Sequence, residues 1–228
     1  MNMPAPQVPT AAWSIYRAIV GIGALCALLI VTVYQTTADR IRENQERFLA
    51  QAISQVLPAA QFTVAVELGD DGRLVETAEV FSLPVLLGYD ENNELIGAAV
   101  AAEGMGYQDN IRVLYAYSFE LAAIVGFKIL DSKETPGLGD RVETEAHFLA
   151  NFEKLDATLT ADGAALLHPI VTVKQGKKTE AWQVDGITGA TITSEAIGEI
   201  LNKSANAWVP VLERNSHAFS NSELNEEQ

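Results

Sequence analysis

The apolar positions of the N-terminal part form one unbroken run followed by a helical stripe. Residues 18–34 read AIVGIGALCALLIVTVY and contain no charged side chain. This length is near the lower limit for a helix that crosses a bilayer core of roughly 30 Å, and aromatic residues flank it as in an interfacial belt. We therefore place a transmembrane helix at residues 18–35. Apolar residues continue at helical spacing until Pro58, which predicts a connecting helix over residues 36–58.

A cleaved signal peptide is the competing interpretation of this run. The apolar region of a signal peptide usually has about 7–15 residues and ends in a small-residue cleavage site. The run here is longer, and Thr36-Thr37-Ala38 is a weak match to such a site. We favour an uncleaved anchor that follows an N-terminal tail of residues 1–17. Arginines stand on both sides of the run, Arg17 before it and Arg40 after it, so the positive-inside rule gives no orientation.

Beyond Pro58 the apolar pattern shortens to extended runs separated by polar turns. These runs cover residues 62–68, 80–89, 95–101, 111–119 and 123–130. We interpret them as the strands of an antiparallel meander, in which each strand pairs with the next one along the chain.

The C-terminal part has mixed elements. A helix and two short strands are predicted at residues 141–152, 166–173 and 181–184. A last helix follows the hydroxyl-rich segment near residue 191 and is expected to end at Pro210. Together the elements predict an α+β fold, a twisted antiparallel sheet with packed helices. We assign residues 59–212 to this domain and residues 213–228 to an acidic C-terminal tail.

Composition limits the chemistry. With 228 residues, of which 48% are hydrophobic, the chain can bury one core of ordinary size without disulfides. The formal net charge of -15 argues against nucleic acid as a partner. The single cysteine, Cys26, excludes a disulfide framework, a zinc cluster and iron–sulfur ligation by this chain alone. The histidines, His147, His168 and His217, lack ligand spacing, so no metal site is predicted.

Residues 185–194, DGITGATITS, place a carboxylate, two glycines and several hydroxyls between a predicted strand and a predicted helix. Unpaired backbone N–H groups and the helix dipole favour an anion at such a helix N-terminus. Serine and threonine at this place also serve as ordinary helix N-caps. The pattern alone leaves both interpretations open.

Two other loops are candidates for a binding role. Residues 104–110 contain Gly-x-Gly but lack the later glycine and the helix of a dinucleotide fingerprint, so a turn is favoured. In residues 133–140 a proline and two glycines fix an irregular backbone that can approach a flat ligand, and Leu138 adds an apolar surface. A plain strand-to-helix connector explains the second loop equally well.

The order of these segments resembles a known family. An N-terminal span, the pair Gly106-Tyr107, the loop ETPGLGD at residues 134–140 and the motif at residues 185–194 are similar to the covalent FMN-binding subunits of membrane redox complexes. The resemblance is strongest to the G subunit of the Rnf electron-transport complex, with the C subunit of the sodium-translocating quinone reductase as a relative. It covers the whole chain in layout, and the last two motifs are specific.

The resemblance implies an attachment residue. The family signature Asp-x-x-Ser/Thr-Gly-Ala-Thr falls on Asp185, Thr188, Gly189, Ala190 and Thr191. In the family the final threonine forms a phosphoester with FMN, so Thr191 is the expected site of covalent FMN. Thr193 and Ser194 are then expected to serve only as helix caps.

The resemblance also implies residues that contact the ring of the flavin. The Glu-Thr-Pro-Gly-Leu-Gly loop of the family lies against the flavin, which implies contacts from Thr135 and Leu138, with Glu134 nearby. Tyr107 belongs to the Gly-Tyr loop. The family often has a further glycine after this pair, whereas this chain has Asp109, so the role of that loop is less well defined. No residue is assigned a catalytic or metal-binding role.

The function implied is that of an electron relay with covalent FMN. The complex would pass electrons between ferredoxin and NAD and couple this to ion movement. The partners would be other membrane subunits, and a flavin transferase during maturation. The expected location is the inner (cytoplasmic) membrane, with a single pass and the flavin domain on the periplasmic or extracellular side. Two alternatives stay open: a stand-alone exported FMN protein that serves another reductase, and a cofactor-free anchored binding domain in which Thr191 caps a helix.

Overall fold

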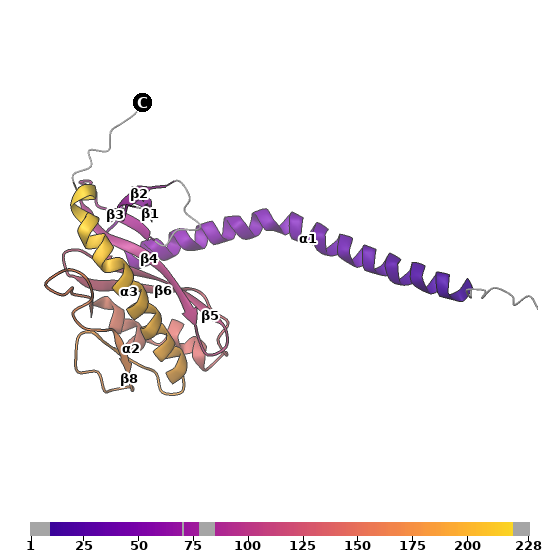
Figure 1. The fold of residues 1–228 in the computed structure, drawn as a ribbon. Helices are drawn as coiled ribbons and strands as arrows, with labels where there is room; N and C mark the ends of the chain where they lie inside the picture. Colours follow the sequence, from indigo (N-terminus) through magenta and orange to yellow (C-terminus); the bar gives the residue numbers. More distant parts are fainter. Residues whose placement is uncertain (1–9, 70, 78–84, 221–228) are drawn as a thin grey trace, which may run out of the picture. The chain divides into compact units, whose positions relative to one another are not determined.

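The computed structural model describes residues 10–69, 71–77 and 85–220, and it begins with one long helix (Figure 1). Helix α1 runs without a break from Thr10 to Val56, so the predicted span and connecting helix are one element. Among the described residues it is the one helix that is long and apolar enough to cross a bilayer. The chain divides into two compact units, residues 1–47 and 48–228. The last turns of α1 belong to the second unit.

The second unit is built on a seven-stranded antiparallel sheet with the strand order β2-β1-β3-β4-β5-β6-β7. The strands are β1 (Phe62–Leu68), β2 (Leu74–Glu76), β3 (Val85–Tyr89), β4 (Leu95–Met105), β5 (Asn110–Ser118), β6 (Ala123–Asp131) and β7 (Leu155–Asp156). Strands β1, β3, β4, β5 and β6 pair in the order of the predicted meander. Residues 80–84 of the predicted second strand lie outside the described residues. The prediction of an α+β fold with an antiparallel sheet is confirmed.

Helix α3 (Thr191–Ser220) packs against one face of this sheet (Figure 1). Tyr115 of β5 and Leu201 of α3 are among the side chains that are fully buried between them. Complete burial of a large apolar side chain contributes about 1.5–3 kcal/mol. The prediction that Pro210 ends the helix was wrong, because Pro210 lies inside α3. Val209 and Leu212 on either side of it are buried, so packing against the sheet outweighs the helix-breaking tendency of proline.

Residues 213–220, which the sequence places in a tail, continue α3 and are fastened to the sheet. Glu213 Oε1 accepts a hydrogen bond of 2.6 Å from the Tyr117 hydroxyl. Asn215 is buried, and its Oδ1 accepts a hydrogen bond from Leu74 N at 3.4 Å. This part of α3 therefore belongs to the folded domain.

The opposite face of the sheet is covered by the end of α1. Ala52, Val56 and Leu57 are buried there, in a second apolar cluster with residues of β1, β3, β4 and β5. A Cβ atom at Gly126 would collide with the carbonyl oxygen of Val56, and one at Gly88 would collide with the side chain of Leu57. Glycine at these positions lets the helix end lie directly on the strands.

Short elements connect the sheet to α3. The single helix predicted for residues 141–152 is divided into η1 (Gly139–Glu143), α2 (Ala146–Leu149) and η2 (Ala150–Glu153). Strands β8 (Val171–Val173) and β9 (Gln183–Asp185) form a separate parallel pair and do not join the main sheet. Residues 186–190 connect β9 to the start of α3.

Candidate functional site

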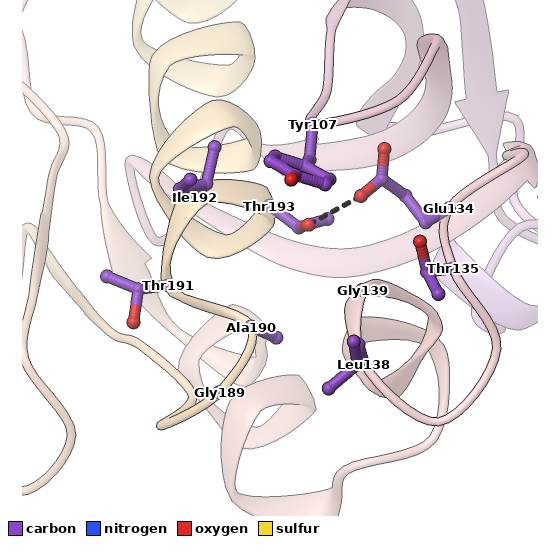
Figure 2. Close-up of a pocket in the computed structure, with 10 residues that line it drawn as sticks. All are labelled: Tyr107, Glu134, Thr135, Leu138, Gly139, Gly189, Ala190, Thr191, Ile192 and Thr193. Carbon is purple, nitrogen blue, oxygen red and sulfur yellow. Dashed lines mark hydrogen bonds between the residues drawn. The ribbon is translucent and has the colours of Figure 1, made fainter.

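The predicted site residues, except Asp185 and Thr188, line one pocket of about 340 Å³ (Figure 2). The pocket is formed by the loop between β4 and β5, the loop between β6 and η1, and the first turn of α3. Its lining residues are Tyr107, Glu134, Thr135, Leu138, Gly139, Gly189, Ala190, Thr191, Ile192 and Thr193. The volume is near the lower end for small-molecule sites. It provides room for a flat ring system and leaves a longer ligand partly outside.

The first turn of α3 offers unpaired backbone donors. The first hydrogen bond of the helix runs from Ser194 N to Ala190 O at 2.9 Å. The amides of residues 191–193 therefore have no carbonyl partner within the helix. Gly189 precedes the turn with a φ of +89°, a conformation that favours glycine. Together with the helix dipole, this is the geometry of an anion site.

The hydroxyl groups of this turn have different surroundings. Thr193 Oγ1 donates a hydrogen bond of 2.6 Å to Glu134 Oε2. Ser194 Oγ donates to Ala190 O at 2.9 Å and accepts a hydrogen bond from Ile187 N at 3.1 Å. Thr191 is exposed, and its side chain points away from the Glu134–Thr193 pair (Figure 2). Thr191 therefore carries the accessible hydroxyl of the turn.

The prediction that Thr193 is only a helix cap was wrong. Its side chain is 2% exposed and lines the pocket, with its hydroxyl on the carboxylate of Glu134. Ser194 Oγ bonds to the carbonyl four residues earlier, so it does not cap the helix by accepting from a later amide. The sequence contains no local signal for the Thr193 contact, because its partner lies 59 residues away.

Asp185 and Thr188 lie outside the pocket lining and brace the loop that precedes α3. Asp185 Oδ1 accepts a hydrogen bond from Gly176 N at 2.7 Å. Thr188 N donates to Gln175 Oε1 at 3.0 Å. Both bonds tie the motif to the turn between β8 and β9. The structure therefore gives these two residues a role in holding the loop.

The loop between β4 and β5 is fastened to the loop after β6 by three bonds. Gln108 N donates to Glu134 Oε1 at 3.0 Å, and Thr135 Oγ1 donates to Gln108 Oε1 at 3.0 Å. Lys133 Nζ lies 2.8 Å from Asp109 Oδ2. The hydrogen bond from Lys133 holds the pKa of Asp109 below its ordinary value. Asp109, at the position where the family often has glycine, thus forms an ion pair that connects the two loops.

Arg141 of η1 lies beside the site but is not among the predicted site residues. Its Nη1 donates a hydrogen bond of 2.9 Å to the carbonyl oxygen of Thr188, and its Nη2 lies 2.9 Å from Glu145 Oε1. A Cβ atom at Gly189 would lie 3.6 Å from Arg141 Nη1. The guanidinium group therefore lies beside the turn that leads to Thr191. Its only sequence signal is the spacing of four residues to Glu145.

Exposed apolar side chains surround the pocket. Tyr107, Leu138 and Ile192 are 65%, 52% and 56% exposed. Large apolar side chains gathered at a concave site favour a flat apolar ligand, because the ligand removes their surface from water. Within residues 10–69, 71–77 and 85–220, no group of three or more His, Cys, Asp or Glu side chains is placed to hold a metal ion.

Comparison with known proteins assigns the family. The FMN-binding domain family matches residues 106–206, and the RnfG N-terminal region matches residues 19–56. The G subunit of the ion-translocating oxidoreductase complex of Methanosarcina acetivorans is 30% identical over 192 residues, which cover 80% of this chain and 87% of that protein. The chain belongs to this RnfG family.

Other relatives in the family agree with this assignment. The G subunit of the Na⁺-translocating ferredoxin:NAD⁺ oxidoreductase complex of Acetobacterium woodii is 29% identical, over 82% of this chain and 86% of that protein. Among solved structures, the C subunit of the Na⁺-translocating NADH-quinone reductase of Parabacteroides distasonis has the same fold. It aligns with a TM-score of 0.58 and 20% identity, over 76% of this chain and 96% of that chain.

The residues of the pocket fit FMN. The apolar side chains at its rim suit the faces of the flavin ring, and the unpaired amides at residues 191–193 suit the phosphate. The match to the FMN-binding domain covers all the pocket residues. Membership of the RnfG family, together with the span in α1, supports a single-pass membrane protein.

Proposed function

We propose that Thr191 carries FMN through a phosphoester bond and that this RnfG homologue relays electrons through that flavin. The observation that carries the proposal is the difference between the hydroxyls of one turn. Thr193 and Ser194 are buried and hydrogen-bonded, whereas Thr191 is exposed beside unpaired amides. A phosphate on Thr191 would lie at the N-terminus of α3, where N–H groups and the helix dipole stabilise negative charge.

The remaining pocket residues would orient the ring. Leu138 and Ile192 offer apolar surfaces, and Thr135 and Tyr107 add polar atoms at the rim. Attachment through the phosphate leaves the ring free to enter the pocket. When bound, FMN supplies the oxidation and reduction chemistry, and the protein determines its position and electrostatic surroundings.

Attachment needs a second protein, because a threonine hydroxyl is a poor nucleophile and no general base is bonded to Thr191 among the described residues. We propose that a flavin transferase supplies the activation and that Thr191 is its substrate. Arg141 and the braces at Asp185 and Thr188 would hold the turn in the shape that this enzyme recognises.

The proposed complex passes electrons between ferredoxin and NAD and couples the transfer to ion movement, as the name of the Acetobacterium woodii relative states for that protein. The single span in α1 would anchor the chain in the cytoplasmic membrane, with the flavin domain on the periplasmic or extracellular side. Its partners would be the other membrane subunits of such a complex.

Covalent flavin is tested by expressing the full chain with and without a flavin transferase. The chain from the first culture should fluoresce as a flavin band on a denaturing gel, and mass spectrometry should find the mass of an FMN phosphoester on the peptide that contains Thr191. Thr191→Ala should lose the band. Thr144→Ala, which removes an exposed hydroxyl outside the motif and the pocket, should keep it. A band that survives Thr191→Ala would show that the flavin is attached elsewhere.

Two alternatives are separated by further outcomes. A chain that stays colourless with the transferase present would support a cofactor-free anchored domain. A flavin-loaded chain that is isolated from solubilised membranes without partner subunits would support a stand-alone FMN protein. Co-isolation with other membrane subunits supports the relay.

A further inference from the structure

Glu134 is a buried charged group in the wall of the pocket. Glu134 is 6% exposed. It lines the cavity together with nine neutral residues of the described part of the chain. Both carboxylate oxygens accept hydrogen bonds. Oε1 accepts from Gln108 N at 3.0 Å. Oε2 accepts from Thr193 Oγ1 at 2.6 Å, the bond that Figure 2 shows. Neither oxygen of the carboxylate is therefore left without a donor. The group is thus held in place by the protein before any ligand enters.

The backbone around this carboxylate is shaped to admit it. A Cβ atom at Gly106 would lie 2.6 Å from Glu134 Oε1, and one at Gly139 would collide with Glu134 Oε2. Neither glycine has a positive φ, so glycine is needed at both places for space. Gly139 therefore leaves room for this side chain, and Gly106 leaves room for it and for the side chain of Ile111.

We propose that Glu134 lowers the reduction potential of the flavin that occupies this pocket and that Thr193 is the residue that positions its carboxylate. The inference rests on the proposed function, since it requires FMN in the pocket. Reduction adds electrons to the ring, and a fixed negative charge nearby makes the electron-rich form less favourable. The charge acts through a region of low dielectric, where electrostatic interactions are stronger than in water.

The neighbouring cations are bonded to other groups, so they do not offset the negative charge of Glu134 by direct contact. Lys133 is paired with Asp109, and Arg141 is engaged with Glu145 and the Thr188 carbonyl. Glu134 itself is bonded to a neutral hydroxyl and a neutral amide. Its negative charge is therefore stabilised by dipoles, with no cation paired to it among the described residues.

The test is a redox titration of the purified full-length chain with its covalent flavin. Glu134→Gln keeps the shape and can still accept from Gln108 N while its amide donates to Thr193. We expect the flavin attached to this variant to have a more positive midpoint potential than the flavin of the wild type. Glu195→Gln removes an exposed negative charge on α3 and should leave the potential unchanged. Glu134→Asp keeps the charge and should stay closer to the wild-type potential than Glu134→Gln does.

A variant that alters these contacts without altering charge shows whether a change in loop structure, and not the lost charge, explains a shift in the midpoint potential. Gln108→Ala removes the bond from Thr135 Oγ1 but keeps the backbone donor to Glu134, so it loosens the loop without altering charge. An unchanged potential in this variant supports the proposal. If Gln108→Ala raised the potential as much as Glu134→Gln, or if Glu134→Gln titrated like the wild type, the proposal would be overturned. A wild-type chain that takes up no flavin would instead contradict the proposed function.

Discussion

Thr193 Oγ1 lies 2.6 Å from Glu134 Oε2 and joins two segments that are 59 residues apart in the chain. Both residues are buried. The bond connects the first turn of α3, which carries Ile192, to the loop after β6, which carries Leu138. These two apolar side chains form part of the pocket lining. This bond and the bond from Arg141 to the Thr188 carbonyl therefore both hold the pocket walls together.

Removal of that hydroxyl should destabilise the fold. Thr193→Val keeps the shape of the side chain but leaves Glu134 Oε2 without its donor inside the protein. We expect the free energy of unfolding to fall by about 1–3 kcal/mol, the usual effect of leaving a buried polar group unsatisfied. Denaturant unfolding of the full chain, followed by near-ultraviolet circular dichroism, measures the change. Thr193→Ser restores the donor and should recover most of the loss. Equal midpoints for Thr193→Val and the wild type would show that the bond contributes no net stability.

Arg141 should affect flavin attachment more than stability. Arg141→Met removes the bond to the Thr188 carbonyl and the ion pair with Glu145. The ion pair is partly exposed, so its loss should cost only about 0.5–1 kcal/mol. The turn before Thr191 loses its support, and the fraction of chains with covalent flavin should fall several-fold after a fixed time with the transferase. Arg112→Met is the control, because its contact with Glu103 is long, at 3.9 Å, and exposed. A similar flavin yield in both variants would contradict the prediction.

The buried tyrosines should make the fold sensitive to high pH. Burial raises the pKa of Tyr117, and its hydrogen bond to Glu213 raises it further. Burial also raises the pKa of Tyr115. Above pH 10 the phenols ionise in the unfolded chain but not in the folded one. The unfolded state then binds fewer protons, so stability is full below about pH 10 and falls as the pH rises, by about 1.4 kcal/mol per pH unit for each tyrosine.

Tyr117→Phe tests this dependence. The variant should be less stable than the wild type near neutral pH, because Glu213 loses its donor, by about 1 kcal/mol. Above pH 10 its stability should fall less steeply, since one of the buried phenols is gone. Urea unfolding at a series of alkaline pH values gives both slopes. Identical slopes for the two proteins would show that Tyr117 ionises as readily in the folded state as in the unfolded state.

The contact between Gly126 and Val56 should tolerate no added methyl group. In Gly126→Ala the new Cβ would collide with the carbonyl oxygen of Val56, so the end of α1 or strand β6 must shift. Overpacking of this kind costs about 1–3 kcal/mol. Thermal unfolding of the full chain measures the loss. Gly23→Ala makes the same substitution in the span, where no heavy atom lies within 4 Å of the new Cβ, and should leave the unfolding of the domain unchanged.

The elements that the sequence predicted well are those with local causes. Strand β1 has the predicted bounds at residues 62–68. The turn between β3 and β4 is stabilised by a local side chain, because Asp90 Oδ1 accepts hydrogen bonds from the amides of Asn92 and Glu94. Asn93 adopts a φ of +62°, which suits its residue type. Side chains within five positions of each other determine this geometry, so the pattern of the meander is visible in the sequence.

The features that were missed depend on contacts between distant segments. Pro210 continues a helix because the sheet buries its neighbours Val209 and Leu212. Arg141 supports the motif by donating to a backbone carbonyl. Every residue has such a carbonyl, so the sequence gives no sign of this contact. Most of the site residues came from the resemblance to a family, and the structure separates them into pocket lining and supports such as Asp185. No periodicity distinguishes these two roles.

Burial of two of the hydroxyls in the first turn of α3 also has a consequence for biogenesis. In an unfolded chain Thr191, Thr193 and Ser194 are similar primary and secondary alcohols along one short stretch. They become different only when α3 has packed on the sheet and Glu134 has reached Thr193. A modifying enzyme that chooses by accessibility can therefore distinguish Thr191 from the other two only in a folded chain. If FMN is attached at Thr191 as proposed, selective attachment would be a late step that follows folding of the domain.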